Sequence, residues 1–456
     1  MHINPAFTIS TVPTVAGAVL ATCTYWKIPQ IIYRLLKKWR RNSWKISIRV
    51  RKKRQLMLSS LKQAFQIHQN YMTPPETIPQ NEVEADSMSQ SLKEVMDLCV
   101  VNHGVSFLAA LPLCKQMSAV KIAEGTYAEI YKLTHVDGSH RIFKCMPVNG
   151  QHPDSGNINL PIEMAIPDII CSSFLSELNE GPVYLAPNFP KVYKISLIKD
   201  EFPAAMMRCW WDYKNSPKRL EDPAEHFQPN LYPEDQLYLA TELDYCGEPA
   251  TLKNMRNAWS GLSIITQVAS ALAIAEVAFN FEHRDLHLGN LLLNETNCPE
   301  MRYVLESFNF SVQTVGQQVF VIDFTLSRIN VGGVHYMSLD HCVCDNDEET
   351  ECDNLWLDHR TVYKVMAEYS SGQWSNYMPV TNVLWLKYIL EHVLHSLFRN
   401  NPSFRQIATN RSDENQMRAV RLLRGWNDTI LEFNSARSLL FNLILKNNPL
   451  VTIMQS

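Results

Sequence analysis

Residues 282–293, EHRDLHLGNLLL, decide the fold, because they set His283, Arg284, Asp285 and His287 directly before a Gly-Asn pair and an apolar run. A solvated surface segment needs neither the glycine nor the apolar residues. In the pattern H-R-D-x-x-x-x-N, a carboxylate and a carboxamide stand five residues apart in one segment. This spacing predicts a catalytic loop, and the surrounding segments indicate which chemistry it serves.

The elements on either side of this loop are predicted to be buried. Residues 258–280 are long and nearly uncharged, which indicates a helix buried on most sides, and residues 317–329 include a short buried strand that ends at Asp323. A carboxylate at the end of a buried strand is costly unless it binds a cation. Asn290 and Asp323 are therefore candidate ligands for Mg²⁺, and Asp285 is a candidate to accept the proton of an attacking hydroxyl.

Upstream segments supply the other parts that phosphoryl transfer from a nucleotide needs, a cover over the phosphates and a cation. Residues 120–136 predict two strands around the turn AEGTYAEI (123–130), whose backbone N–H groups can face phosphate. Residues 140–148 predict the next strand, which carries Lys144 as the cation.

The order of the elements predicts the fold class. Strands gather in the first part of the body, with another at 236–245, and residues 160–178 predict a helix that begins after Pro167. Residues 355–446 are helical in pattern. This order indicates an α+β, bilobal body with a strand-rich N-lobe and a helical C-lobe.

Each feature alone has a plainer interpretation. Gly125 could be an ordinary hairpin residue and Lys144 a surface lysine, while His283 is better explained as a core histidine that braces the loop. His283 and His287 could ligate zinc from one helix, but the Gly-Asn ending favours a loop. The features in this order are together a strong signal.

The combination resembles the protein-kinase superfamily, although HxDLHxGN also occurs in small-molecule kinases of the aminoglycoside-phosphotransferase type. Other stretches narrow the resemblance to haspin-family protein kinases, over about residues 106–443. They are FLAALPLCKQMSAVKIAEGTYAEIYK, IPDIICSSFLSEL, LYLATELDYCGEPATL, VFVIDFTLSRI, YMPVTNVLWLKYILEHVL and ILEFNSARSLL. IDFTLSR and NVLWL are the most specific, because general kinases lack both.

The resemblance implies a role for each matching residue. Lys144 would hold the α- and β-phosphates of ATP, Asp285 would be the catalytic base, and Asn290 and Asp323 would bind Mg²⁺. The hinge that holds adenine would comprise Leu243, Asp244, Tyr245 and Cys246.

The helix partner of Lys144, normally a glutamate, falls on Asp168. Aspartate is one methylene shorter, so we expect a stretched ion pair or a shifted helix. Glu163 and Glu177 are alternatives, each off the matching register.

Two departures weaken the phosphate cover. Ala123 and Ala128 stand where glycines are usual, and only Gly125 remains, so we expect weaker ATP binding. Thr325 replaces the glycine of D-F-G, and no proline occurs between residues 324 and 378, so no A-P-E motif can follow. The resemblance implies a kinase that is ready without activation-loop phosphorylation.

The resemblance also implies a substrate, because family members phosphorylate a threonine near the start of a basic histone tail. Residues 1–75 hold 13 Lys and Arg and no Asp or Glu. The rest of the chain therefore holds 29 Lys and Arg and 46 Asp and Glu, a formal charge of −17. Within this acidic body, DNDEETECD (345–353) offers Asp345, Asp347 and Glu348 as candidates to pair with substrate lysine and arginine. Two alternatives stay open: a catalytically weak or inactive relative that binds ATP or a partner, and a small-molecule kinase.

The basic extension has no counterpart in the resemblance. Residues 7–26 are about long enough to span a bilayer, and the basic residues at 27–54 could bind nucleic acid or an anionic membrane. With 11 unpatterned cysteines, the chain is expected to be intracellular, in nucleus and cytoplasm, or else anchored through 7–26. We also expect a monomer. The expected domains are an extension (1–72), a linker (73–90) and a kinase domain (91–456), with an N-lobe at about 106–245 and a C-lobe at about 247–456.

Overall fold

The computed structural model describes residues 104–111, 117–153, 159–217, 227–251, 254–342, 355–400 and 414–454, all within the compact unit Glu82–Ser456. The expected extension, with its segments 7–26 and 27–54, lies outside the described residues. So do the linker 73–90 and the acidic run 345–353. The predicted domain boundaries stay predictions.

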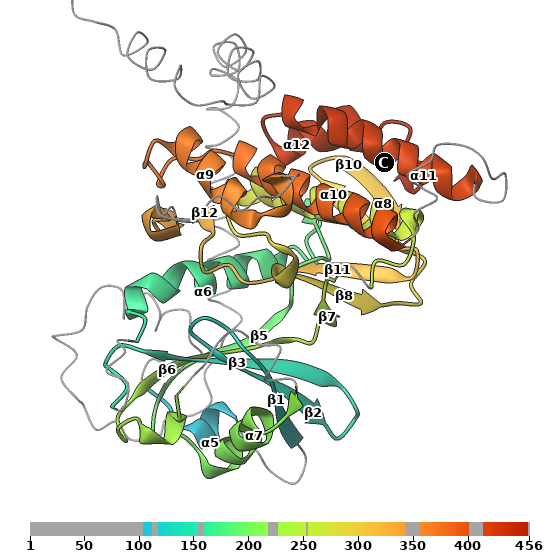
Figure 1. Ribbon diagram of the computed structural model, residues 1–456. Helices are drawn as coiled ribbons and strands as arrows, with labels where there is room; N and C mark the ends of the chain where they lie inside the picture. Colours follow the sequence, from blue (N-terminus) through green and yellow to red (C-terminus); the bar gives the residue numbers. More distant parts are fainter. Residues whose placement is uncertain are drawn as a thin grey trace, which may run out of the picture. The chain divides into compact units, whose positions relative to one another are not determined.

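The first part of the described chain is built around a five-stranded antiparallel sheet with the strand order β1-β2-β3-β6-β5 (Figure 1). Its strands are β1 (Met117–Glu124), β2 (Glu129–His135), β3 (His140–Val148), β5 (Val192–Lys199) and β6 (Leu237–Asp244). The helices of this part are α5 (Phe107–Ala110), α6 (Ile162–Glu177), α7 (Ala204–Lys214) and the 3-10 turn η3 (Pro229–Leu231).

Alternation along β3 gives the sheet two buried faces, because successive side chains of a strand point to opposite sides. Phe143 and Cys145 join the cluster that contains Trp210 of α7. Met146 and Val148 face the other way and join the main core with α6. Lys144 shares this second parity, which turns its side chain toward α6.

The second part of the chain packs around one helix, α8 (Ala258–Phe279). This helix is long and apolar enough to cross a membrane, but 94% of its apolar window is buried inside the fold, so it is the core helix that the sequence predicts. Asn257 caps its first turn through a capping box with Ser260, and Asn280 ends it at φ 49°. The helices α10 (Val380–Asn400), α11 (Glu414–Thr429) and α12 (Ala436–Leu439) and the turn η10 (Leu440–Ile444) pack against it. Helix α9 (His359–Ser370) and the 3-10 turn η9 (Ile430–Glu432) pack on α10.

Short sheets complete this part, and of their strands only β11 corresponds to a predicted strand. One sheet has the order β11-β8-β7, one β14-β10-β9-β4, and one β12-β13. The strands are β4 (Tyr184–Leu185), β7 (Glu248–Pro249), β8 (Leu291–Glu295), β9 (Glu300–Leu305), β10 (Phe308–Gln313), β11 (Gln317–Val321), β12 (Arg328–Asn330), β13 (Val334–Tyr336) and β14 (Val451–Met454). The remaining 3-10 turns are η4 (Leu288–Asn290), η5 (Asp340–Cys342) and η6 (Leu355–Leu357).

The fold class is confirmed, with strands in the first part and helices dominating the second, but two boundaries are wrong. Helix α6 begins at Ile162, and Pro167 lies inside it. Proline there loses one helical hydrogen bond, and the burial of Ile162, Ala165 and Ile166 outweighs that loss. Strand β11 ends at Val321, two residues before Asp323, whose φ of 62° is incompatible with a strand.

Candidate active site

The predicted hinge connects the two parts of the fold. Strand β6 ends at Asp244, and β7 begins at Glu248 and pairs with β8 beside the catalytic loop (Figure 1). Gly247 adopts φ 94°, and a Cβ there would lie 2.3 Å from the carbonyl oxygen of Leu293, so only glycine fits. The chain therefore passes from one part to the other through residues 245–247.

The side chains of the hinge are engaged elsewhere. Asp244 accepts a 2.6 Å hydrogen bond from Tyr193, and Tyr245 donates one of 2.7 Å to Glu248. Cys246 is buried. A base bound at this hinge would therefore meet the backbone of Asp244, Tyr245 and Cys246 rather than the Asp and Tyr side chains.

The catalytic loop holds Asp285 from two sides. Asn290 Nδ2 donates to the backbone oxygen of Asp285 at 2.8 Å and lies 3.4 Å from its Oδ2. The hydroxyl of Tyr363, on α9, donates a short hydrogen bond to Oδ1. Burial raises the pKa of Asp285 to about 7, and the bonds from Tyr363 and Asn290 oppose that rise. Asp285 is thus an oriented carboxylate whose pKa lies near neutrality, as a general base requires.

His283 braces the loop, as the sequence predicts. It is fully buried, its Nε2 lies 3.0 Å from the backbone oxygen of Ile322, and its Nδ1 lies 3.3 Å from the N–H of Asp285. Burial lowers its pKa to about 4, so the ring is neutral and carries its proton on Nε2. The backbone N–H of His283 donates to Asn382 Oδ1 at 3.0 Å, and Asn382 Nδ2 in turn donates to Glu276 and to the Phe281 carbonyl, each at 3.0 Å. This chain of bonds ties the loop to α8 and α10.

Lys144, Asp168 and Asp323 converge from β3, α6 and the segment after β11. Lys144 Nζ lies 2.7 Å from Asp168 Oδ2 and 3.8 Å from Asp323 Oδ1. Burial would lower the pKa of Lys144, but the two carboxylates raise it well above its ordinary value. Burial likewise acts to raise the pKa of Asp323, yet Lys144 and Thr325 bring it below its ordinary value. Both groups are therefore charged at neutral pH.

The Lys144–Asp168 ion pair is not stretched, so that branch of the expectation is wrong, and the shifted helix stays a prediction. The carboxylate also does a second task, because its Oδ1 accepts the backbone N–H of Phe324 at 3.1 Å. Phe324 is buried against the rings of Phe189, Phe281 and His283. Helix α6, β3 and the Asp323 segment are thus locked by one carboxylate. Glu163 and Glu177, the alternatives, are both exposed.

The Mg²⁺ candidates come from adjacent segments, because the N–H of Ile322 donates to the backbone oxygen of Asn290 at 3.0 Å. Among the described residues, no group of three or more His, Cys, Asp and Glu side chains forms a metal site. One carboxylate and one carboxamide nevertheless fit Mg²⁺, which completes its shell with phosphate and water oxygens. The charge of Asp323 would favour such a cation.

The glycine turn joins β1 and β2, as the sequence predicts. Its N–H at Gly125 donates to the oxygen of Ala128 at 2.8 Å, and Ala128 is buried. Gly125 is not among the residues with positive φ, so an alanine-like conformation suffices here. Ala123 lies at the end of β1, opposite Ile130.

Arg284 has a partner that the sequence analysis missed. Its guanidinium is fully buried and donates to both oxygens of Glu282 at 3.2 Å, and its backbone φ is 67°. Glu282 also accepts from Met378 N at 2.8 Å and from Thr381 Oγ1 at 2.9 Å. The charge of Arg284 is therefore neutralised by a residue two positions earlier. The bonds that fix Glu282 come from Met378 and Thr381, 96 and 99 residues away, and no local pattern could have shown them.

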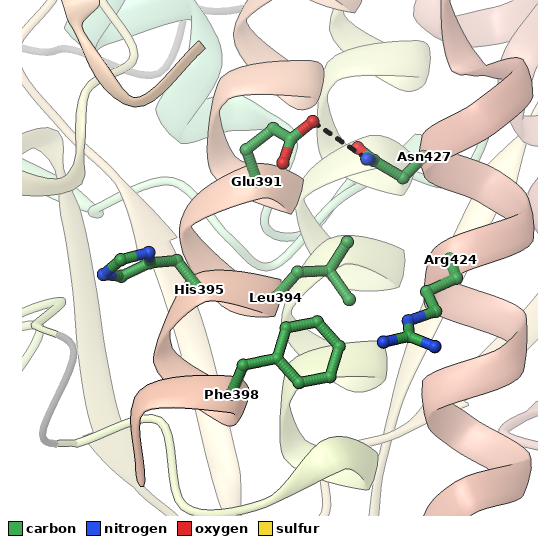
Figure 2. Close-up of a pocket in the computed structure, with 6 residues that line it drawn as sticks. All are labelled: Glu391, Leu394, His395, Phe398, Arg424 and Asn427. Atoms are coloured by element: carbon green, nitrogen blue, oxygen red, sulfur yellow. Dashed lines mark hydrogen bonds between the residues drawn. The ribbon is translucent and has the colours of Figure 1, made fainter. Parts of the chain in front are cut away.

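Two further findings concern the remaining candidates. Asp345, Asp347 and Glu348 lie outside the described residues, so their role stays a prediction. Figure 2 shows a hollow of about 260 Å³ between α10 and α11, lined by Glu391, Leu394, His395, Phe398, Arg424 and Asn427. None of the predicted site residues lines it.

Comparison with known proteins agrees with this geometry. The family model described as "Haspin like kinase domain" matches residues 77–440. The chain is 28% identical to serine/threonine-protein kinase haspin of Mus musculus over 364 residues, 78% of this chain and 45% of that protein. It is 27% identical to the haspin homolog of Drosophila melanogaster over 67% of this chain and 53% of that protein. It is 28% identical to the haspin homolog of Arabidopsis thaliana over 67% of this chain and 49% of that protein. The chain therefore spans about half the length of these relatives.

The family match covers well over half of the chain, and it includes the hinge, the catalytic loop, Lys144 and Asp323. The strand-rich first part, the helical second part and the convergent ion cluster are those of a kinase domain. The chain belongs to the haspin-like kinase family.

Proposed function

We propose that this protein is an ATP-dependent serine/threonine protein kinase that phosphorylates a threonine in a basic substrate of the histone-tail type. The observation that carries the proposal is the convergence of Lys144, Asp168 and Asp323 beside the half-buried, oriented Asp285. Relatives that match most of the chain are named serine/threonine-protein kinases, which supports the same activity.

The residues of the chain divide the work of transfer. Lys144 neutralises the α- and β-phosphates, and the backbone of the Gly125 turn covers them. Asp285 accepts the proton of the acceptor hydroxyl while the oxygen of that hydroxyl forms a bond to the γ-phosphorus. The bond from that phosphorus to the β-bridging oxygen breaks, and ADP leaves with the electron pair. Mg²⁺, when bound by Asn290 and Asp323, would offset the phosphate charge.

The charge of the chain supports the basic acceptor that the family resemblance implies. The chain beyond residue 75 carries a formal charge of −17, and a cleft in such a body attracts peptides rich in lysine and arginine. A histone tail is a peptide of this kind. The acidic candidates Asp345, Asp347 and Glu348 would pair with its cations, and chromatin would be the place of action, with the protein in nucleus and cytoplasm as a monomer.

The alternative of an inactive relative loses one of its supports. It depended on Ala123, Ala128 and Asp168, and the 2.7 Å contact of Asp168 with Lys144 removes the third. The two alanines leave weaker ATP binding as the remaining difference from a glycine-rich turn.

The test uses the full chain, Mg-ATP and a histone-tail peptide with a single threonine. We expect phosphate transfer by the wild type, and a loss of about 10²–10⁴-fold in kcat for Asp285→Asn, because general-base catalysis supplies that range. A neutral peptide with the same threonine is the control for acceptor class. Equal transfer by wild type and Asp285→Asn would refute the assignment of the base.

The basic arm calls for a separate experiment. We propose that residues 27–54 bind an anionic surface, either nucleic acid or membrane. Full-length protein and a protein lacking residues 1–75 would be compared for retention on DNA and on vesicles containing phosphatidylserine. Unchanged retention on both would refute the proposal that residues 27–54 bind an anionic surface.

A further inference from the structure

Behind the phosphate-covering turn lies a group of four ions, here named the ion quartet. Its members are the buried Lys121, Glu124 and Glu129 and the half-buried Lys214. Glu124 is the last residue of β1 and Glu129 the first of β2, and they stand directly opposite each other in the sheet. The turn Gly125–Ala128 is all that separates them. Two buried carboxylates at this spacing repel each other unless cations join them.

Lys121 supplies one of those cations. Its Nζ lies 2.6 Å from Glu124 Oε1 and also pairs with Glu129, and its side chain is fully buried. Residues three apart in a regular strand point to opposite faces. The pairing of β1 with β2 is irregular between Lys121 and Ala123, and this bulge brings Lys121 and Glu124 to the same face.

Helix α7 supplies the second cation. Lys214, its last residue, lies 2.8 Å from Glu124 Oε1 and 2.9 Å from Oε2. The ring of Trp210, also on α7 and buried, has its centroid 5.1 Å from the ammonium of Lys214 and 5.7 Å from that of Lys121. The quartet is thus balanced in charge, enclosed by an aromatic ring and tied to a helix outside the sheet.

The quartet lies on the face of the sheet opposite to Lys144. Glu129 pairs with Cys145 across β2 and β3, and Cys145 belongs to the cluster beside α7. Lys144 pairs with Ile130 and faces α6. The quartet therefore cannot touch a nucleotide held by Lys144, and any effect on it must pass through the turn.

We propose that the ion quartet is a positioning device. Lys214 of α7 holds Glu124 at one end of the turn Gly125–Ala128, and Lys121 joins Glu124 to Glu129 at the other end, so that the turn stays over the ATP phosphates. This inference rests on the proposed kinase function. A turn with one glycine has few conformations to choose from, so its two ends must be held where the backbone N–H groups meet phosphate. Helix α7 supplies this hold from the face of the sheet opposite to Lys144.

The test removes the α7 cation in the full chain. For Lys214→Met, we expect KM for ATP to rise roughly 10-fold with kcat within about 2-fold of wild type, the pattern of lost nucleotide binding without loss of chemistry. Lys214→Arg keeps the charge and should restore KM. Arg208→Met, which removes an exposed cation from the same helix, is the matched control and should leave KM unchanged.

A second variant guards against a folding defect. Glu124→Gln combined with Lys214→Met leaves Lys121 and Glu129 as a balanced pair, so it should fold better than Lys214→Met alone and still show the raised KM. If the wild type is active and either variant has the KM for ATP of the wild type, the positioning role is refuted. The kinase proposal is unaffected by that result. A wild type that neither binds Mg-ATP nor transfers phosphate overturns the kinase proposal and this one with it.

Discussion

Replacing Asp168 tests whether an aspartate side chain is long enough for the ion pair with Lys144. If the ion pair were stretched, restoring the usual glutamate would strengthen it. The structure predicts the reverse, because both oxygens of Asp168 are already engaged, at 2.7 Å with Lys144 and 3.1 Å with the N–H of Phe324, and the residue is 6% exposed. An extra methylene must displace α6 or bend the pair, which costs about 1–3 kcal/mol of stability.

Two further variants separate the two contacts. Asp168→Asn keeps an oxygen that can accept from Phe324 but removes the charge that pairs with Lys144. Lys144 still has Asp323 at 3.8 Å, so we expect the free energy of unfolding to fall by about 1–3 kcal/mol. This is less than the roughly 3–5 kcal/mol lost when a buried charge is left without any partner. Asp168→Ala also leaves the Phe324 N–H without its partner, which adds about 1–3 kcal/mol. The expected order of stability is wild type, then Asn and Glu, then Ala.

Urea unfolding of the full chain measures the stabilities, and KM for ATP reports the site. Glu163→Gln is the control, because Glu163 is exposed on the same helix and should change stability by no more than about 0.5 kcal/mol. Higher stability and a lower KM in Asp168→Glu would refute the geometry argued here.

Three other predictions follow from the catalytic loop. The transfer rate should rise with pH through about 7, because burial raises the pKa of Asp285 to about 7 and only the ionised carboxylate can accept a proton; a kcat profile from pH 5.5 to 8.5 that stays flat would contradict this. Tyr363→Phe removes a hydrogen bond that favours the ionised form of Asp285, so it should shift the midpoint of that profile upward and lower kcat about 3- to 10-fold at pH 7, the range expected from part of a bond to a charged group. Asn382→Asp turns a donor into a carboxylate facing Glu276 and should destabilise the protein by about 3 kcal/mol, measured by urea unfolding, whereas wild-type stability would mean that the link from α8 to His283 is dispensable.

Local patterns predicted much of the fold because their residues are constrained by their immediate neighbours. Strand β3 has the predicted bounds, His140–Val148, and the uncharged helix α8 is buried as expected. The strands β9 and β10 were missed, although two runs of alternating residues separated by Glu306 and Ser307 could have indicated a hairpin. The start of α6 was misjudged because a local rule for Pro167 yielded to tertiary burial.

Lys144, Asp168 and Asp323 fall close together, and Asn290 contacts Asp285, but the other partners of these residues could not be predicted. Tyr363 lies 78 residues from Asp285 in the chain, and nothing in its neighbourhood marks it as a donor to that carboxylate. The second contact of Asp168, with Phe324, spans 156 residues. Charged motif residues are visible in a sequence, whereas the long-range bonds that orient them depend on packing that no local pattern records.

The enclosure of Arg284 bears on how such an enzyme could be controlled. In a kinase that is switched by a phosphorylated loop, the arginine of this motif is the receptor for the added phosphate. Here a carboxylate from the same chain, Glu282, already fills that place and is itself fixed by Met378 and Thr381. An added phosphate would have to displace this buried carboxylate, so we expect cells to limit this protein by its abundance and its location rather than by turning the domain on.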